Sequence, residues 1–152
     1  MRNASVKRWM NVRSISAPAT IALVGVLILG RCTPSTTIAL KGGEIAPAAE
    51  GAAVVKVGPN GNTELSISVK HLANPQDVDA GTHQYVVWVQ PLGADPHAQN
   101  AGTLALDDNL KGRLDTLTAL HDFDMFITPE NTGTVPEPHG RKVLQAHITR
   151  NE

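Results

Sequence analysis

Histidines and aspartates are the residues of this sequence that could do chemistry. The six histidines are His71, His83, His97, His121, His139 and His147. No two of them have the spacing that brings two ring nitrogens onto one metal ion, such as i and i+4 on a helix or i and i+2 on a strand. We therefore predict no metal ion and no other cofactor, although histidines that converge in the fold could still bind a metal or a small ligand.

The nearest approach to a metal site is His121 followed by Asp122 and Asp124. Successive side chains of a strand lie on opposite faces, so His121 should point away from both aspartates, which share the other face. Paired carboxylates can transfer protons. Carboxylates that alternate with apolar residues are nevertheless typical of the solvent-exposed face of an edge strand, and we predict no catalytic role for them.

Two further polar groups have structural interpretations. The oxygens of Asp107, Asp108 and Asn109 suit calcium, but their spacing differs from that of the twelve-residue calcium loop, and such residues are common in tight turns. Ser66 and Ser68 face outward in an alternating segment without the glycine-flanked turn that exposes a nucleophilic serine. The chain also lacks the glycine-rich motifs that bind phosphates or dinucleotides, and we predict that it is not an enzyme.

Composition limits the class of protein. The chain has 152 residues, of which 41% are hydrophobic and only 3% aromatic, so a core must be built from aliphatic side chains. All 14 acidic residues lie after residue 31, whereas residues 1–31 contain five of the 13 lysines and arginines. An acidic body without a basic stripe does not suit nucleic-acid binding.

The N-terminal segment has the pattern of an export signal. Basic residues at positions 2, 7, 8 and 13 precede a stretch from Ser14 to Gly30 without any charge. Such a segment keeps its positive end in the cytoplasm while the apolar run enters the bilayer. We predict residues 1–32 to be a signal peptide or helical membrane anchor, and the rest to lie outside the cytoplasm.

Cys32 is the only cysteine, so an intrachain disulfide is excluded. It ends the sequence Leu29-Gly30-Arg31-Cys32, which resembles a bacterial lipoprotein signal with a lipidated cysteine. Arg31 departs from that pattern, because a small residue normally precedes the cysteine. Three alternatives remain: lipidation at Cys32, ordinary cleavage nearby, or an uncleaved anchor, since the uncharged run is at the lower limit for crossing a bilayer.

Downstream patterns predict strands rather than helices. Leu65, Ile67 and Val69 alternate with polar residues, and Phe123, Met125 and Ile127 recur with the same period of two. Gln84 to Gln90 is almost continuously apolar, which predicts a central strand covered on both faces, with Tyr85 and Trp88 as packing residues rather than a ligand platform. Further strands are expected at 36–40, 52–57, 103–106, 112–118 and 143–149, with tight hairpins at Gly58–Asn62 and Asp107–Lys111.

Seven or eight short strands over about 115 residues predict an all-β, immunoglobulin-like sandwich. We place a linker at residues 33–51 and the sandwich domain at residues 52–150.

Two segments resemble a known family. Tyr85-Val86-Val87-Trp88-Val89 resembles a strand of the extracytoplasmic C-terminal domain of anti-sigma-K-type factors. Phe126-Ile127-Thr128-Pro129-Glu130 and the later Pro136-Glu137-Pro138-His139-Gly140 are similar to the last strand and the Glu-Pro-rich loop of that domain. Only about 13 residues precede the uncharged run, so we expect the outer domain without the helical domain that binds the sigma factor.

These patterns together predict a non-enzymatic, membrane-anchored protein of the cell envelope with an interaction or structural role. The resemblance implies one alternative, a regulatory or sensor module that works through a separate partner. A metal-binding or small-ligand-binding protein is the other. We expect the membrane and an envelope protein as partners, and no nucleic acid.

Overall fold

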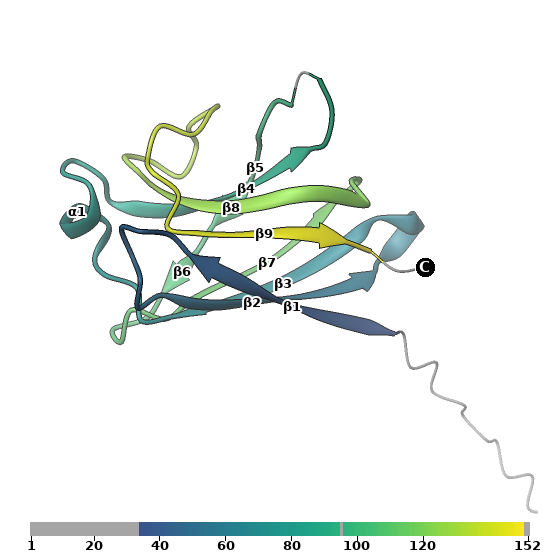
Figure 1. Cartoon of the computed structure of the whole chain (residues 1–152), viewed down its shortest axis with the longest axis horizontal. Coiled ribbons are helices and arrows are strands. Elements are labelled where there is room, and N and C mark those ends of the chain that lie inside the picture. The colour runs from purple at the N-terminus through teal and green to yellow at the C-terminus, as the bar shows by residue number, and fades with distance from the viewer. Residues whose placement is uncertain (1–33, 95, 151–152) are drawn as a thin grey trace, which may run out of the picture. The chain divides into compact units, whose positions relative to one another are not determined.

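The computed structural model describes residues 34–94 and 96–150, and the regular structure in this part of the chain is almost entirely β (Figure 1). The strands are β1 (Ser35–Gly42), β2 (Glu50–Val57), β3 (Thr63–Lys70), β4 (Gln84–Pro91), β5 (Gln99–Thr103), β6 (Ala105–Leu106), β7 (Gly112–Thr118), β8 (Asp122–Glu130) and β9 (Leu144–Thr149). The 3-10 turn η1 (Pro59–Gly61) and the one-turn helix α1 (Pro75–Val78) interrupt them. The all-β prediction is confirmed. The predicted signal or anchor helix and Cys32 lie outside the described residues.

Hydrophobic alternation positions the strands as expected. In β3 the side chains of Leu65, Ile67 and Val69 are buried while their neighbours lie toward solvent. In β8 Phe123 and Met125 are fully buried on either side of the exposed Asp124. A period of two therefore fixes which face of each strand enters the core.

Both predicted hairpins are confirmed. Asn60 and Gly61 adopt positive φ angles of 57° and 77° between β2 and β3, the conformation that an Asn-Gly turn supplies. Between β6 and β7, Asp107 Oδ1 accepts hydrogen bonds from the backbone N–H groups of Asn109 and Lys111, both at 2.9 Å. Asp107 therefore stabilises a turn through its side chain.

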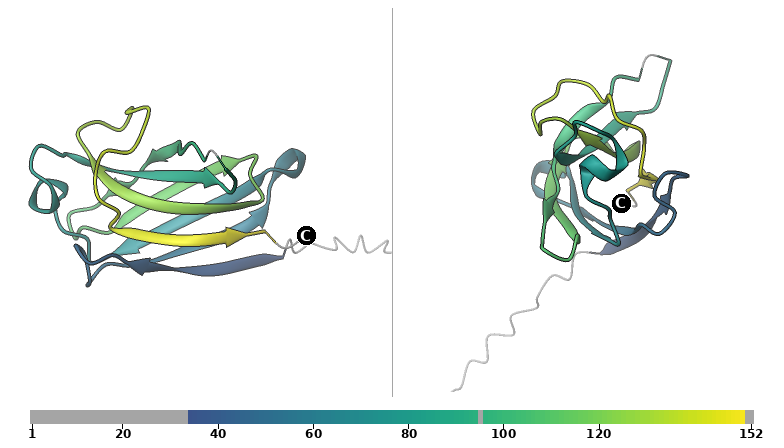
Figure 2. Two further views of the ribbon diagram at one scale, coloured as in Figure 1. Left: turned by 45° about the horizontal axis from the view of Figure 1, so that its top comes forward. Right: turned by 90° about the vertical axis from the view of Figure 1, so that its left-hand side faces the viewer.

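All strand pairs are antiparallel, in the order β5-β4-β8-β9-β1-β2-β3-β7-β6. The chain crosses between the two halves of this sheet three times, from β3 to β4, from β5 to β6 and from β7 to β8. Strand β8 returns beside β4, and β5 contacts β7, as in a Greek key. The sheet curls so that its halves face each other like the layers of a sandwich, and β1 pairs with a strand of each half (Figure 2).

The strand between residues 99 and 106 differs from its prediction. The sequence predicts one strand at 103–106, but β5 begins at Gln99 and a break at Leu104 separates it from β6. Leu104 is buried, and its N–H donates to the carbonyl oxygen of Tyr85 at 2.9 Å. Gly102, at φ 133°, lies where the β4–β5 register shifts. This kink gives nine strands in the described residues instead of seven or eight.

Two hydrophobic clusters cover the two faces of β4. Tyr85, Val87 and Val89 enter the main core between the layers, while Val86 and Trp88 pack with Phe126 on the outer face. Tyr85 and Trp88 are both 0% exposed, so they are packing residues, as predicted. The expectation that this strand is covered on both faces is confirmed.

Most of the expected linker belongs to the sheet. From Ser35 the chain forms β1, and Leu40 and Ala49 are buried in the main core. Ile38 packs against the same core. The β-structure therefore begins well before the predicted boundary at residue 52, because these side chains contribute to its interior.

Candidate functional site

Strands β1 and β9 are paired along only a short part of their length. Two residue pairs join them, Lys41 with Gln145 and Gly42 with Leu144. Beyond these pairs β1 continues to pair with β2 back to Ser35, and β9 continues to pair with β8 up to Thr149. The two strands diverge toward the C-terminal end of β9 (Figure 1). Residues 35–39 and 146–149 therefore face each other across an opening in the sheet.

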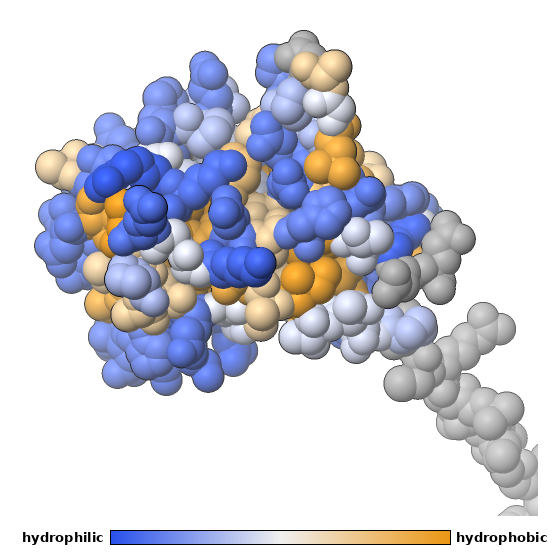
Figure 3. Space-filling view, viewed as in Figure 1, coloured by the Kyte–Doolittle hydropathy of each residue, from blue (hydrophilic) through white to orange (hydrophobic). Residues whose placement is uncertain are grey.

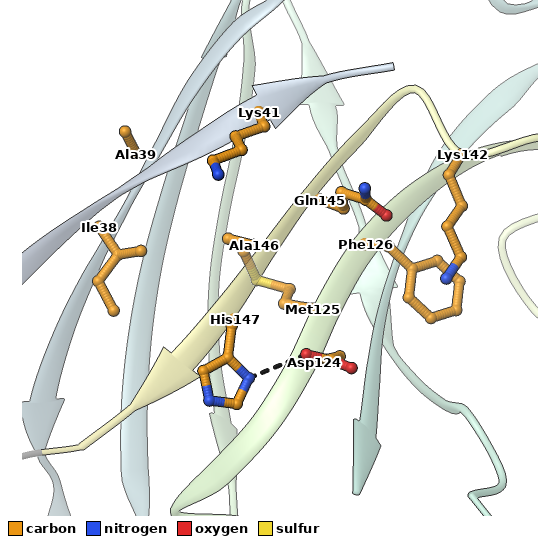
Figure 4. A pocket seen from close by; sticks show the side chains of 10 residues that line it. All are labelled: Ile38, Ala39, Lys41, Asp124, Met125, Phe126, Lys142, Gln145, Ala146 and His147. Atoms are coloured by element: carbon orange, nitrogen blue, oxygen red, sulfur yellow. Dashed lines mark hydrogen bonds and ion pairs between the residues drawn. The ribbon is translucent and has the colours of Figure 1, made fainter. Parts of the chain in front are cut away.

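This opening, called the β1–β9 cleft below, has a volume of about 500 Å³. Its lining residues are Ile38, Ala39, Lys41, Asp124, Met125, Phe126, Lys142, Gln145, Ala146 and His147. The apolar part comes from the side chains of Ile38, Met125 and Ala146, and the polar groups lie around them (Figure 4). In the space-filling view a hydrophobic patch reaches the surface between the positions of β1 and β9 (Figure 3).

One side of the cleft carries a histidine held by two carboxylates. His147 Nδ1 lies 2.9 Å from Asp124 Oδ1, and His147 Nε2 lies 3.1 Å from Asp122 Oδ1. Thr149 Oγ1 donates a further hydrogen bond to Asp122 Oδ1 at 3.1 Å. The three charged side chains are each about half exposed, at 51–55%. The β8–β9 register creates the cluster, because it places Asp124 opposite His147 and Asp122 opposite Thr149.

The charges around His147 favour its protonated form. Its pKa is raised above the usual value, first because Asp124 accepts a hydrogen bond from the ring, and then because the charges of Asp122 and Asp124 stabilise the cation. An imidazolium can donate from both ring nitrogens, which matches a carboxylate at each of them. In this state the ring is a positive charge fixed between two acids rather than a base with a free lone pair.

The prediction for His121 is confirmed. Its ring is directed away from both aspartates: Nε2 lies 3.1 Å from the carbonyl oxygen of Gly61, and Nδ1 lies 3.4 Å from an Arg150 nitrogen. The two aspartates do share the opposite face, but β8 lies between β4 and β9, so it is an interior strand and not the predicted edge strand. The histidine that they do contact is His147, which sequence reasoning missed because the contact depends on pairing across strands.

Two lysines lie near the closed end of the cleft, where β1 and β9 pair: Lys41 on β1 and Lys142 in the connection before β9 (Figure 4). The Nζ of Lys142 lies 4.0 Å from the centre of the Phe126 ring, a cation–π contact. Lys41 follows the part of β1 that diverges from β9. Across residues 34–94 and 96–150, neither lysine lies within ion-pairing distance of a carboxylate. The closed end of the cleft is therefore locally positive on a domain that is acidic overall.

A second polar cluster is buried, and sequence reasoning missed it as well. The indole N–H of Trp88 donates to Thr128 Oγ1 at 2.8 Å, and the Thr128 hydroxyl donates to Glu130 Oε1 at 2.6 Å. The same carboxylate oxygen accepts the backbone N–H groups of His139 and Gly140, at 2.9 and 3.2 Å. Glu130 is only 2% exposed. In the sequence these residues fall within the segments that resemble the anti-sigma outer domain, and that resemblance was the only signal for them.

This buried cluster fixes the loop between β8 and β9 over the outer face of the sheet. Val135 from that loop packs against the cluster of Val86, Trp88 and Phe126. A hollow of about 380 Å³ lies beside Glu130, lined also by the α1–β4 connection. Three hydrogen bonds from the same chain converge on Oε1 of this carboxylate, and His139 Nδ1 lies 3.6 Å from Oε2, so its role is to position this loop.

The remaining candidates are dispersed. Ser66 is half-buried and Ser68 is exposed on β3. The Asp107 carboxylate has a lowered pKa, mainly because it accepts the Lys111 backbone N–H, which agrees with its role in the turn. Burial raises the pKa of Tyr85 to about 12, and its hydroxyl donates to the carbonyl oxygen of Ala73 at 3.0 Å.

Within the described ranges, no group of three or more histidines, cysteines, aspartates or glutamates could hold a metal ion. Among those same residues, every helix is too short or too polar to cross a bilayer.

A scan against protein-family models, a search of curated proteins and a search of solved structures each found no match. The resemblance to the anti-sigma outer domain therefore remains a prediction from the two motifs.

Proposed function

We propose that this chain is a non-enzymatic protein of the cell envelope, held at the membrane by its N-terminal segment, that binds a partner protein through the β1–β9 cleft. The anchor part of the proposal rests on the charge and hydropathy pattern of residues 1–32. The binding part rests on one observation, the two strand edges that face each other without pairing.

The chemistry of the cleft supports binding. Its apolar part provides area to bury, and its rim provides two lysines that form no ion pair within the described residues. Its volume lies within the range of ligand pockets in proteins. The His147 cluster at its rim engages both ring nitrogens with carboxylates, which favours the protonated imidazolium. That arrangement favours a fixed charge pattern for recognition over proton transfer.

Site-specific photo-cross-linking in the full chain tests this proposal. A benzoylphenylalanine replaces Ala39, an exposed residue that lines the cleft, and in the control it replaces Leu117, which is 53% exposed on β7. In bacterial cells that express each protein, we expect one discrete adduct from position 39 and none from position 117. Charge reversal of both Lys41 and Lys142 to glutamate should reduce that adduct.

An equal yield from both positions, or an adduct insensitive to the charge reversal, would contradict the proposal. Mass spectrometry of the adduct then separates the two roles that the sequence left open. A structural envelope protein would favour a supporting role, and a membrane-bound transcriptional regulator would favour the regulatory alternative.

A further inference from the structure

The divergent part of β1 is an edge without the usual protection. Exposed strand edges are normally blocked by charged side chains, proline or a bulge, because free N–H and C=O groups invite another strand. Ser35-Thr36-Thr37-Ile38-Ala39 contains none of these, and its residues are small or β-branched. Its other edge is fully paired with β2, with Ser35 opposite Lys56 and Ala39 opposite Ala52.

From this edge we propose that the β1–β9 cleft accepts an extended peptide segment of the partner protein as an added β-strand. The inference rests on the proposed function and deepens it by naming the class of ligand. Backbone hydrogen bonds to residues 35–39 give affinity, and alternate side chains of the peptide give specificity. An apolar side chain enters toward Ile38, Met125 and Ala146, which form the apolar part of the cleft.

The charges at the closed end of the cleft select the sequence of the peptide. Lys41 and Lys142 both line the cleft, and neither has an ion-pair partner in the described parts of the chain. A glutamate or aspartate of the added strand would supply the missing negative charge. The acids near the open end, Asp122 and Asp124, are already paired with His147. The preferred peptide therefore carries its acidic residue toward the lysines.

The direction of the added strand depends on whether it pairs with one wall of the cleft or with both. Strands β1 and β9 are antiparallel to each other. A strand that pairs with both walls is therefore antiparallel to one and parallel to the other. Because the proposed hydrogen bonds involve residues 35–39 of β1 alone, only one edge of the peptide is paired and its direction stays free. Methylation of the backbone amides on that edge should therefore weaken binding, whereas methylation on the other edge should not.

A second copy of the chain fits this edge less well. A two-fold contact brings the same surface from both copies together. The segment of β1 that a second copy would present, Ser35 to Ala39, contains no carboxylate, so it cannot supply a negative charge to Lys41 or Lys142. A peptide with an acidic residue supplies that charge.

The test uses the purified full chain in mild detergent and a fluorescein-labelled peptide, Thr-Val-Glu-Val-Thr-Val, in fluorescence anisotropy titrations. We expect binding, and at least about tenfold weaker binding when lysine replaces the glutamate. The Lys41→Glu, Lys142→Glu double variant should reverse this preference. Lys111→Glu, an exposed charge reversal in the β6–β7 turn, is the control and should leave it unchanged.

Two N-methylated peptides, each blocking one alternate set of amides, test the backbone pairing. One should lose binding at least about tenfold while the other retains it, and hydrogen exchange of residues 35–39 should slow when the unmethylated peptide binds. Equal binding of both methylated peptides, no binding of the parent peptide, or dimers that involve β1 would overturn strand addition. If strand addition fails in this way but position 39 still gives its discrete cross-linked adduct, the proposed partner-binding function is retained.

Discussion

At the scale of single residues, His147 shows how a sheet assembles a charged cluster from separate segments. Its ring belongs to β9, and both of its acidic partners belong to β8. Each contact is a cross-strand pair or its diagonal neighbour, so two strands suffice to place three charges within hydrogen-bonding distance. The cluster is exposed, and it therefore shapes the charge pattern of the cleft more than the stability of the fold.

The titration of His147 provides a direct check. In the full chain, NMR should show a pKa above the ordinary histidine value of 6.5, and Asp124→Asn should lower it because the strongest hydrogen bond is lost. Asp115→Asn, an exposed change on β7, is the control and should leave the pKa unchanged. An unaltered His147 pKa in Asp124→Asn would contradict the geometry of this cluster.

The sign of the linked stability follows from that raised pKa. The ion pairs stabilise the folded chain fully at pH values below 6.5, where histidine is protonated in both states. The contribution disappears as the pH rises through the raised pKa of the folded state. The difference in unfolding midpoint between wild type and Asp124→Asn should therefore shrink as the pH rises from 6.5 through the raised pKa of His147.

At the scale of elements, the loop after β8 depends on a single buried carboxylate. Glu130 accepts the N–H groups of His139 and Gly140, and the Gly140 backbone lies directly against Pro129. A side chain at position 140 would overlap the Pro129 carbonyl oxygen, which cannot move without distorting β8. The loop is thus fixed by backbone contacts at its C-terminal part.

Gly140→Ala should consequently destabilise the protein by about 1–3 kcal/mol, the cost of overpacking a rigid contact. Gly133→Ala in the same loop is the matched control. An added methyl group there meets the ends of the Thr103 and Gln84 side chains, which can rotate away, so a smaller loss is expected. Chemical denaturation followed by circular dichroism measures both, and equal losses would argue against the backbone contact at Gly140.

At the scale of the whole molecule, the proposed anchor and the first strand of the proposed binding cleft are adjacent in the sequence. Only Thr33 and Pro34 separate Cys32 from Ser35, the first residue of β1. An extended chain advances at most about 3.3–3.6 Å per residue. If Cys32 carries lipid, the open end of the cleft is held close to the membrane surface, where a membrane-associated partner would meet it.

Fractionation of cells that express the tagged full chain tests the anchor. We expect the protein in the membrane fraction, with its C-terminal tag accessible to protease added outside the inner membrane. Cys32→Ser should remove radiolabelled palmitate and release the protein if lipid is the anchor, because one chemical group then carries the attachment. Retention of the variant in membranes would indicate the uncleaved span, and cytosolic wild-type protein would contradict export.

The local pattern of the sequence determined the strands and their turns. Alternation placed Leu65, Ile67 and Phe123 in the core, and Asn60-Gly61 closed a hairpin, because side-chain periodicity and turn chemistry depend on neighbours along the chain. The extent of β1 was underestimated, since its burial comes from contacts with distant strands.

Only the tertiary structure decided which strands lie side by side and in which register. A shift of one residue between β8 and β9 would turn His147 to the other face and separate it from Asp124. The divergence of β1 from β9 and the burial of Glu130 likewise arise from curvature of the whole sheet and from loop packing. Pairing energies between distant segments set these features, and no local pattern in the chain contains them.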